Sequence, residues 1–350
     1  MSELLQGGRA RRRRPRRHGR RGPTRVRRDH GAGRLRAAAF VGLGLVATAA
    51  VLLALMDARA SGPSLVKLRA TSRGGGSRAT SQVVVTRSQY GVRPAPPSER
   101  VAVHLKLPLR SGLLFDVHSG DVLWQRNPDK VVPIASLTKM MTALIVVAHS
   151  RTTDRVLITP AAVHFTGSGV GLLPVHKRVP ELALLYGLLL PSGNDAAIAL
   201  AQHVAGSRGR FIAMMNARAR ELGLGCTHFN SVSGVVDQGN HSCAADLALM
   251  AHEVLQQPLL GAIVGTRNAV VPFPIKGGKL YLYNNNPLLV TGYPGTDGVK
   301  TGYTTASGPC LIVTARRGRN WLGAVLLNSA NTVSQAEALL NAGFAKLRSS

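Results

Sequence analysis

The chain has 350 residues, 45% of them hydrophobic, which excludes a wholly disordered protein and allows one or two domains. Aromatic residues make up only 4%, so a folded core must consist mainly of Leu, Val, Ala and Ile. The net charge of +28 would suit nucleic acid or an anionic membrane, depending on where the charge lies.

Much of the charge lies at the N-terminus. Residues 1–36 hold 14 arginines against two acids, Glu3 and Asp29, and residues 37–56 then carry no charge. A helix of that length is about 30 Å long, the hydrocarbon thickness of a bilayer. A basic flank before an apolar span predicts a cytoplasmic N-terminus. We therefore predict an Arg-rich cytoplasmic tail (1–36), a transmembrane helix (37–56) and an extracytoplasmic remainder in a single-pass protein of the cell membrane.

Two alternatives to this arrangement concern the N-terminal region: cleavage of the apolar segment as a signal peptide, and binding of nucleic acid by the arginines. Ala58-Arg59-Ala60 fits a signal-peptide cleavage site, which would give a secreted protein. Signal peptides have apolar cores of about 7–15 residues, so the longer span here favours an anchor. Because no aromatic residues interleave the arginines, we expect no nucleic acid partner. Anionic lipid headgroups of the cytoplasmic membrane suit the tail better.

The three cysteines are Cys226, Cys243 and Cys310, with no CxxC pair among them. Outside the cytoplasm, Cys226 and Cys243 could form one disulfide, but buried small hydrophobic residues would fit the same pattern. Both interpretations stay open. No HExxH motif and no metal-ligand spacing of cysteines is present, so we predict no metal ligands and no cofactor.

The remaining elements follow in chain order. Residues 57–100, rich in Ser, Gly, Arg and Pro, are typical of a flexible linker, which leaves 101–350 as the folded extracytoplasmic domain. A hairpin is predicted from strands 111–117 and 122–125, followed by an apolar and therefore buried helix over 136–148. That helix is too short to be a second membrane span.

Three further helices are predicted in the middle of the chain. The first has Pro180 as its first helical residue and stops before Pro191, the second is capped by Asp195 and ends at Gly206, and the third has helical spacing from Phe211 to Gly223. A second hairpin (310–314 and 321–327) and a helix over 333–347 close the chain. Strands at both ends with helices between them predict an α+β fold in which the terminal strands pair in one antiparallel sheet.

Ser136-Leu137-Thr138-Lys139 places a hydroxyl and an amine on one face of the predicted helix. A serine is a poor nucleophile until a base takes its proton, and lysine is a base only as the uncharged amine. Neutralising an ordinary lysine at pH 7 costs roughly 4–5 kcal/mol. Burial against Met140 and Met141 and a second cation would both lower this cost.

The SxxK pattern alone is weak, because Ser64-Leu65-Val66-Lys67 matches it within the linker. The ordered set is specific: Ser136-Leu137-Thr138-Lys139 is followed by Ser192-Gly193-Asn194, and then by Lys300-Thr301-Gly302 at the start of a predicted strand. The SxxK decoy has no partners in that order.

The three motifs resemble the signature of penicillin-binding proteins and class A β-lactamases. Their flanks, residues 133–142, 188–197 and 294–304, are similar to those of serine-type D-alanyl-D-alanine carboxypeptidases of the low-molecular-mass penicillin-binding protein family. The resemblance covers about residues 111–330. It implies a β-lactamase-like, penicillin-binding transpeptidase-like fold, with an antiparallel sheet packed against a helical region.

The resemblance also implies the catalytic roles. Ser136 would attack the peptide carbonyl between two terminal D-alanines, Lys139 would take its proton, and Ser192 would carry a proton to the leaving amine. The backbone N–H groups of Ser136 and Tyr303 would form the oxyanion hole.

Substrate binding is implied for the remaining motif residues. Asn194 would hydrogen-bond the substrate's amide backbone, and Lys300 and Thr301 would hold its terminal carboxylate. Lys300 would also be the second cation beside Lys139. Gly302, having no side chain, would let the substrate lie against the strand.

The function implied is removal of the terminal D-alanine from peptidoglycan stem peptides ending in D-Ala-D-Ala, with β-lactams as covalent inhibitors and a part in cell-wall organisation and cell shape. A D,D-endopeptidase or a β-lactamase on the same fold, or a catalytically weak cell-wall or β-lactam binding protein, are the alternatives. A class A β-lactamase needs a glutamate to activate water. Between Asn194 and Lys300 the glutamates are Glu221 and Glu253, and neither lies in an ExxLN context, so this alternative ranks lower.

Overall fold

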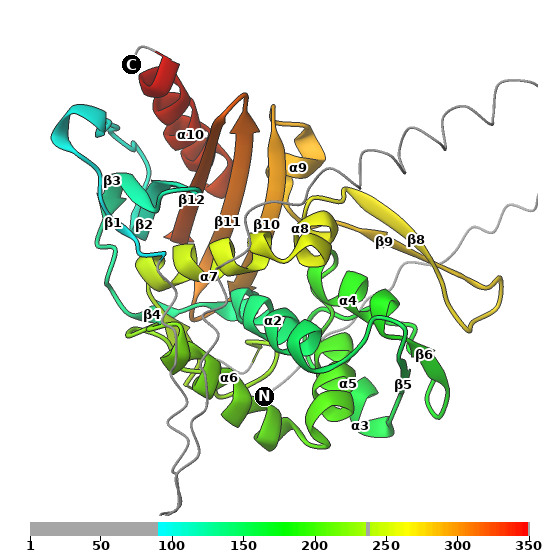
Figure 1. Cartoon of the computed structure of the whole chain (residues 1–350). Helices are drawn as coiled ribbons and strands as arrows, with labels where there is room; N and C mark the ends of the chain where they lie inside the picture. The colour runs from blue at the N-terminus through cyan, green and yellow to red at the C-terminus, as the bar shows by residue number, and fades with distance from the viewer. Residues whose placement is uncertain (1–89, 236–238, 349–350) are drawn as a thin grey trace, which may run out of the picture. The chain divides into compact units, whose positions relative to one another are not determined.

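A six-stranded sheet forms one side of the folded part of the chain (Figure 1). The computed structural model describes residues 90–235 and 239–348; the predicted tail, the predicted span 37–56 and most of the predicted linker lie outside them. The strand order is β1-β3-β2-β12-β11-β10. The strands are β1 (Arg93–Pro94), β2 (Leu109–Asp116), β3 (Asp121–Arg126), β10 (Thr296–Thr304), β11 (Gly308–Arg317) and β12 (Asn320–Ser329).

The two ends of the domain meet in this sheet. Strand β12 pairs antiparallel with both β11 and β2, with Val325 opposite Leu113 in the second pair. The predicted pairing of terminal strands and both predicted hairpins are therefore confirmed. The two-residue strand β1 differs, because it runs parallel to β3 at the edge of the sheet.

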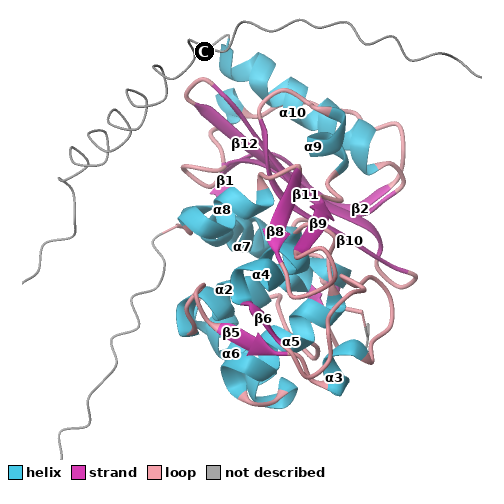
Figure 2. Ribbon diagram, turned by 90° about the vertical axis from the view of Figure 1, so that its right-hand side faces the viewer, coloured by secondary structure: helices cyan, strands magenta, loops and turns pink. Residues whose placement is uncertain are grey.

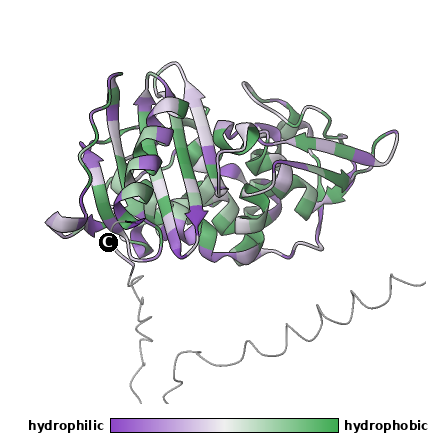
Figure 3. Cartoon of the chain, turned by 90° about the horizontal axis from the view of Figure 1, so that it is seen from above, coloured by the Kyte–Doolittle hydropathy of each residue, from purple (hydrophilic) through white to green (hydrophobic). Residues whose placement is uncertain are grey.

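Alternation along the strands builds a separate core on each face of the sheet. In β2, Leu114 joins a cluster with α10 (Thr332–Arg348), whereas Phe115 joins a larger cluster with α7 (Ala244–Gln256). Figure 2 shows α10 on one side of the sheet and α7 on the other. Because both faces are covered, the central strands β11 and β12 are buried along most of their length. Figure 3 shows hydrophobic residues distributed over both the strands and the helices of the domain.

The helical region packs against the α7 face of the sheet (Figure 1). Three short two-stranded sheets accompany it: β4 (Val132–Pro133) with β7 (His241–Ser242), β5 (Arg155–Leu157) with β6 (Arg178–Pro180), and β8 (Asn268–Pro272) with β9 (Lys279–Tyr283). Its α-helices are α2 (Lys139–His149), α3 (Pro160–Val163), α4 (Glu181–Leu189), α5 (Asn194–Ala205), α6 (Arg208–Glu221) and α8 (Pro258–Val264). The short helix α9 (Pro287–Thr291) lies on the α10 side instead (Figure 2), where Leu288 joins the α10 cluster. The 3-10 turns are η1 (Pro97–Glu99) and η2 (Ala135–Thr138).

The predicted helices are present, with shifted starts. The helix expected over 136–148 begins as the 3-10 turn η2 and continues as α2. Pro180 is the N-cap of α4 and not its first helical residue. Gly193 is the N-cap of α5, so Asp195 lies inside the first turn and does not cap it; the predicted end at Gly206 is confirmed by its left-handed φ of 72°.

The last residues of the predicted linker belong to the folded domain. Tyr90 stacks on His252 of α7 with ring centroids 3.5 Å apart, and Arg93 forms an ion pair with Asp121 at 3.0 Å. Ala95 is buried. The structure therefore places these residues, which precede the predicted boundary at 101, against the sheet and α7.

Among the described residues, no single helix is long and apolar enough to cross a membrane. Helices α7 and α8 together would be long and apolar enough, but they meet at an angle of 107°. The predicted membrane span is not among the described residues and stays a prediction.

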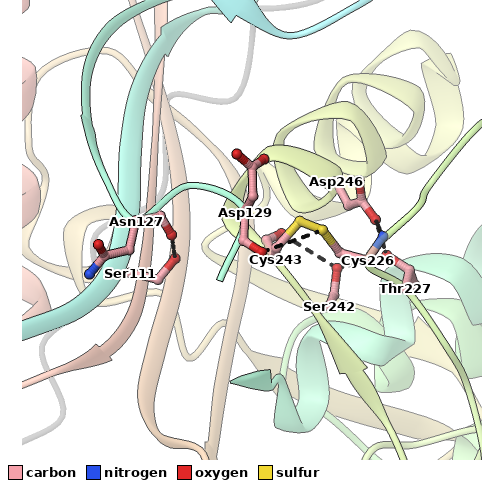
Figure 4. The surroundings of a disulfide bond; sticks show 8 residues. All are labelled: Ser111, Asn127, Asp129, Cys226, Thr227, Ser242, Cys243 and Asp246. Atoms are coloured by element: carbon pink, nitrogen blue, oxygen red, sulfur yellow. Dashed lines mark hydrogen bonds between the residues drawn. A yellow bond between two sulfur atoms is a disulfide. The ribbon is translucent and has the colours of Figure 1, made fainter. Parts of the chain in front are cut away.

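Cys226 and Cys243 form a disulfide, so the disulfide interpretation of this pair holds (Figure 4). Their Cα atoms lie 5.6 Å apart, within the usual range for such a bond. Cys243 is the N-cap residue of α7, and Asp246 in the first turn accepts hydrogen bonds from the Cys226 amide and the Thr227 hydroxyl, both at 2.7 Å. The bond therefore ties the loop after α6 to the start of α7. Cys310 lies elsewhere, buried in β11.

Removing this disulfide is expected to lower the free energy of unfolding by roughly 3 kcal/mol, the usual effect of closing a loop of about 15 residues. The double variant Cys226→Ser/Cys243→Ser and the wild type in reductant should both show this loss in denaturant titrations. The same double variant is the control, because reductant should leave it unchanged. A wild type that is insensitive to reductant would contradict the pairing.

Candidate active site

Ser136 and Lys139 meet at the junction of η2 and α2. The Lys139 Nζ atom donates to Ser136 Oγ at 2.8 Å and to the backbone carbonyl of Ser233 at 2.8 Å. Lys139 is fully buried, whereas Ser136 is partly exposed. The predicted spacing of the two side chains is therefore confirmed, with the hydroxyl accessible and the amine shielded from water.

Backbone strain and a buried network hold this junction in place. Ala135 has a φ of 47°, in the left-handed region that a residue with a side chain rarely adopts. A Cβ at Gly234 would clash with the Ala135 carbonyl, so only glycine fits there. Asn240 Nδ2 donates to Thr138 Oγ1 at 3.2 Å and to Ser231 Oγ at 2.8 Å. Ser231 and Asn240 are thereby fastened to the turn that carries the nucleophile.

The surroundings of Lys139 favour its uncharged form. Burial, and after it the nearby charge of Lys300, hold the pKa of Lys139 well below its usual value, against a smaller opposing effect of Asp195. An uncharged amine can accept the hydroxyl proton along the same 2.8 Å contact. The pair therefore has the geometry and the electrostatics of a nucleophile with its base.

The second motif lies where the loop after α4 leads into α5, with Asn194 as the first residue of that helix. Ser192 has a φ of 68° and is buried, and the side chain of Asn194 is also buried. Within the described residues, Ser192 Oγ and Asn194 Oδ1 have no hydrogen-bond partner, although Asn194 Nδ2 donates to the Thr166 carbonyl at 2.7 Å. Buried polar atoms without partners are uncommon and are often completed by a ligand.

The third motif lies in the middle of β10 and not at the start of a strand. Lys300 is buried, its Nζ atom donates to the Thr301 carbonyl at 3.0 Å, and burial lowers its pKa to about 7. A Cβ at Gly302 would lie 3.2 Å from the Ser136 backbone nitrogen, so this strand runs directly beside the nucleophile. Strand β10 is the sheet's edge, which leaves the backbone on its outer side open to a ligand.

A side chain at Gly302 should disturb that contact. In Gly302→Ala the new methyl group would lie 3.0 Å from the Ile134 carbonyl and 3.2 Å from the Ser136 nitrogen, closer than carbon normally approaches either. We expect at least a tenfold slower acylation of Ser136, because a displaced oxyanion donor costs roughly 10²–10³ in rate. Stopped-flow acylation by a fluorescent penicillin measures this. Gly209→Ala is the control, since nothing lies within 4 Å of its Cβ; equal slowing in both variants would contradict the assignment.

A cavity of about 530 Å³ opens next to these residues. Asn194 and Ser233, whose carbonyl holds Lys139, both line it, with Phe165, Ile198 and Ile212 among the apolar walls. Gly302 of the third motif thus lies beside the Ser136 backbone of the first motif. Asn194 of the second motif lines the same cavity as Ser233, the residue that binds Lys139. The roles of Ser192, Asn194, Thr301 and the Tyr303 N–H toward a substrate stay predictions.

Three residues of the site were not predicted. Ser233 acts through its backbone carbonyl, which has no sequence signal. Asn240 follows Gly239 in the sequence, and its hydrogen bonds to Thr138 and Ser231 have no local sequence pattern. Asp195 follows the second motif directly, and its carboxylate accepts hydrogen bonds from the Val170 and Gly171 amides at 2.8 and 2.9 Å, which fixes the loop before β6. Its position directly after Ser192-Gly193-Asn194 was the sequence feature that could have indicated a role at the site.

The sequence is similar to bacterial D-alanyl-D-alanine carboxypeptidases and to an endopeptidase. It is 34% identical over 214 residues to the D-alanyl-D-alanine carboxypeptidase DacF of Bacillus subtilis, covering 60% of this chain and 54% of that protein. It is 33% identical over 237 residues to a D-alanyl-D-alanine endopeptidase of Pseudomonas aeruginosa, covering 67% and 76% respectively. The chain thus spans about half the length of the Bacillus relative.

Solved structures share the fold. The Streptomyces K15 DD-transpeptidase is 31% identical with a TM-score of 0.65, covering 70% of this chain and 100% of that one. The D-alanyl-D-alanine carboxypeptidase of Mycobacterium tuberculosis H37Rv is 30% identical with a TM-score of 0.64, covering 70% and 96%. The fold and the buried Ser–Lys pair thus define a protein of the penicillin-binding and β-lactamase-like α+β class, as predicted.

The family follows from the match of residues 100–331 to peptidase S11, the D-alanyl-D-alanine carboxypeptidases. This chain belongs to that family, which confirms the resemblance inferred from the three motifs.

Proposed function

We propose that this chain is a serine-type D-alanyl-D-alanine carboxypeptidase that removes the terminal D-alanine from peptidoglycan stem peptides. The proposal is carried by the 2.8 Å contact between Ser136 Oγ and the buried Lys139 amine, in a member of this family. In this role the enzyme would take part in cell-wall organisation and cell shape, and β-lactams would acylate the same serine.

The reaction would begin with proton transfer from Ser136 to Lys139. The Ser136 oxygen attacks the carbonyl of the penultimate D-alanine, and the oxyanion accepts hydrogen bonds from the Ser136 and Tyr303 backbone N–H groups. Ser192 passes the proton held by Lys139 to the nitrogen of the departing D-alanine. Water then hydrolyses the ester on Ser136 and releases the shortened peptide.

The substrate would be held on both sides of the scissile bond. Lys300 and Thr301 bind the terminal carboxylate, and Asn194, whose Oδ1 atom has no partner among the described residues, binds the peptide's amide backbone. The cavity beside Asn194 leaves room for the rest of the acyl donor. Gly302 lets the peptide approach β10 closely.

Two measurements on the purified full-length chain test this function. A pentapeptide ending in D-Ala-D-Ala should lose one D-alanine per turnover, and labelled penicillin should give a covalent band on a gel. Fast penicillin turnover without D-alanine release would instead indicate a β-lactamase. The absence of both labelling and release would indicate a binding protein without this activity.

A D,D-endopeptidase is the second candidate, because a relative at 33% identity carries that name. Such an enzyme cleaves the cross-link between two stem peptides, so that it releases a peptide and not a single D-alanine. Cross-linked stem-peptide dimers that are cleaved faster than the pentapeptide would favour it. The carboxypeptidase proposal expects the reverse order of rates.

We further propose that residues 37–56 anchor the chain in the cell membrane, with the tail 1–36 in the cytoplasm near anionic lipids and the domain outside. The uncharged span behind an arginine-rich flank supports this. Cell fractionation with mass measurement of the membrane-bound protein tests it. A soluble product beginning near Ser61 would favour secretion after cleavage at Ala58-Arg59-Ala60 instead.

A further inference from the structure

Three side chains meet at the end of the helical region away from the nucleophile. Asp154 precedes β5, Glu181 is the first residue of α4, and His203 lies in the last turns of α5. His203 lies about 13 Å along α5 from Asn194, at 1.5 Å per residue. One ligand atom from each of the three lies within 4.8 Å of the other two.

Glu181 is the unusual member of this cluster. Its side chain is 0% exposed, and neither carboxylate oxygen accepts a hydrogen bond of normal geometry among the described residues. The nearby Ser150 hydroxyl, which lowers the pKa of Glu181 somewhat, donates to the Val146 carbonyl at 2.8 Å. An ionised carboxylate in such a place needs a cation, because burial disfavours the charged form. Burial accordingly raises the pKa of Glu181 above its usual value. Where the structure is described, Glu181 and Asp154 both pair with His203, which is charged only when protonated, and neither pairs with a lysine or arginine.

The distances suit ligands around an ion better than direct hydrogen bonds. His203 Nε2 lies 3.5 Å from Asp154 Oδ2 and 3.6 Å from Glu181 Oε2, both beyond a normal hydrogen bond. Ligands about 2.0–2.1 Å from a tetrahedral Zn²⁺ are about 3.3 Å apart. The Arg151 amide donates to Asp154 Oδ2 at 3.2 Å, which orients that carboxylate.

The cluster is also accessible. The side chains of Asp154 and His203 are 37% and 24% exposed, so an ion can enter from solvent and keep a water molecule. We propose that Asp154, Glu181 and His203 bind one Zn²⁺ ion, with water as the fourth ligand. Imidazole with two carboxylates suits Zn²⁺, whereas Mg²⁺ and Ca²⁺ prefer oxygen ligands alone.

Such an ion would join the residue before β5, the start of α4 and the end of α5. This is the end of the α4–α5 pair opposite the loop that carries Ser192. Another cluster among the described residues, Cys226, Cys243 and Asp246, has both sulfurs in the disulfide and does not compete. The zinc site is thus structural and independent of the proposed reaction.

The test uses the full-length chain after treatment with a chelator. Titration calorimetry with ZnCl₂ should show one ion bound per chain, and the melting temperature should rise with zinc but not with equal MgCl₂ or CaCl₂. His203→Ala should weaken zinc binding at least a hundredfold. His241→Ala is the matched control. His241 stacks with His228, and these two histidines are another place where zinc could bind.

The variant Glu181→Gln tests whether the cluster binds a metal ion or is only a group of neighbouring ionisable side chains. The amide removes the buried charge, so the chelated variant should be as stable as the wild type while losing its zinc-dependent rise in melting temperature. If zinc stabilises neither protein, or if zinc binding survives in His203→Ala and disappears in His241→Ala, the proposal is wrong. A response to Mg²⁺ or Ca²⁺ as large as that to Zn²⁺ would also overturn it.

Discussion

Replacing Ser136 by alanine is expected to abolish covalent labelling by penicillin and to lower D-alanine release by roughly 10⁶-fold, the effect of removing the nucleophile in another serine hydrolase. The physical reason is that, within the part of the chain that the structure describes, the buried Lys139 amine hydrogen-bonds to the Ser136 hydroxyl at 2.8 Å and to no other hydroxyl. Lys139 keeps its hydrogen bond to the Ser233 carbonyl, so the variant should still fold. Gel fluorography and a D-alanine assay measure the two losses.

The chain offers a matched control for this variant. Ser64 and Lys67 have the same spacing as Ser136 and Lys139 but lack the two later motifs. Ser64→Ala should therefore label and turn over like the wild type. Persistent labelling of Ser136→Ala, or its loss in Ser64→Ala, would refute the assignment of the nucleophile.

The overall fold was predictable because its signals are local. The continuous apolar runs of β11 and β12 on either side of Arg317 and Asn320 define a hairpin, and Gly206 ends α5 in the left-handed conformation it favours. Asp195 was misplaced for a physical reason. Its carboxylate binds the backbone of Val170 and Gly171, a long-range contact that competes with capping and leaves no local signal.

The site was predictable only where side chains do the chemistry. Ser136, Lys139 and Lys300 stand in motifs, whereas the carbonyl of Ser233 comes from a loop that only the fold brings to Lys139. The same limit applies to the proposed zinc ligands. Asp154, Glu181 and His203 are widely separated in sequence and match no ligand spacing, which is why no metal was predicted from the sequence.

Replacing Lys300 by methionine is expected to raise the KM for peptides with a free terminal carboxylate about 10–150-fold, because a hydrogen bond to a charged group contributes about 1.5–3 kcal/mol. Methionine keeps the length of this buried side chain while removing its charge. A peptide amide should be a poor substrate for both forms and should show no such change. Lys279→Met is the control, since Lys279 is exposed on β9.

The pH profile provides a sharper test of the same residue. Burial lowers the pKa of Lys300 to about 7, so its ammonium is present below that pH, and kcat/KM for carboxylate substrates should fall as pH rises through about 7. Lys139 must be uncharged to act as a base, so its titration gives the limb that rises with pH. The charge of Lys300 helps to lower the pKa of Lys139, and therefore Lys300→Met should move that rising limb to higher pH. Since the variant also lacks the titrating ammonium, the falling limb should disappear. Acylation rates measured from pH 5 to 10 would show both changes, and an unchanged profile would mean that Lys300 neither binds the carboxylate nor acts on Lys139.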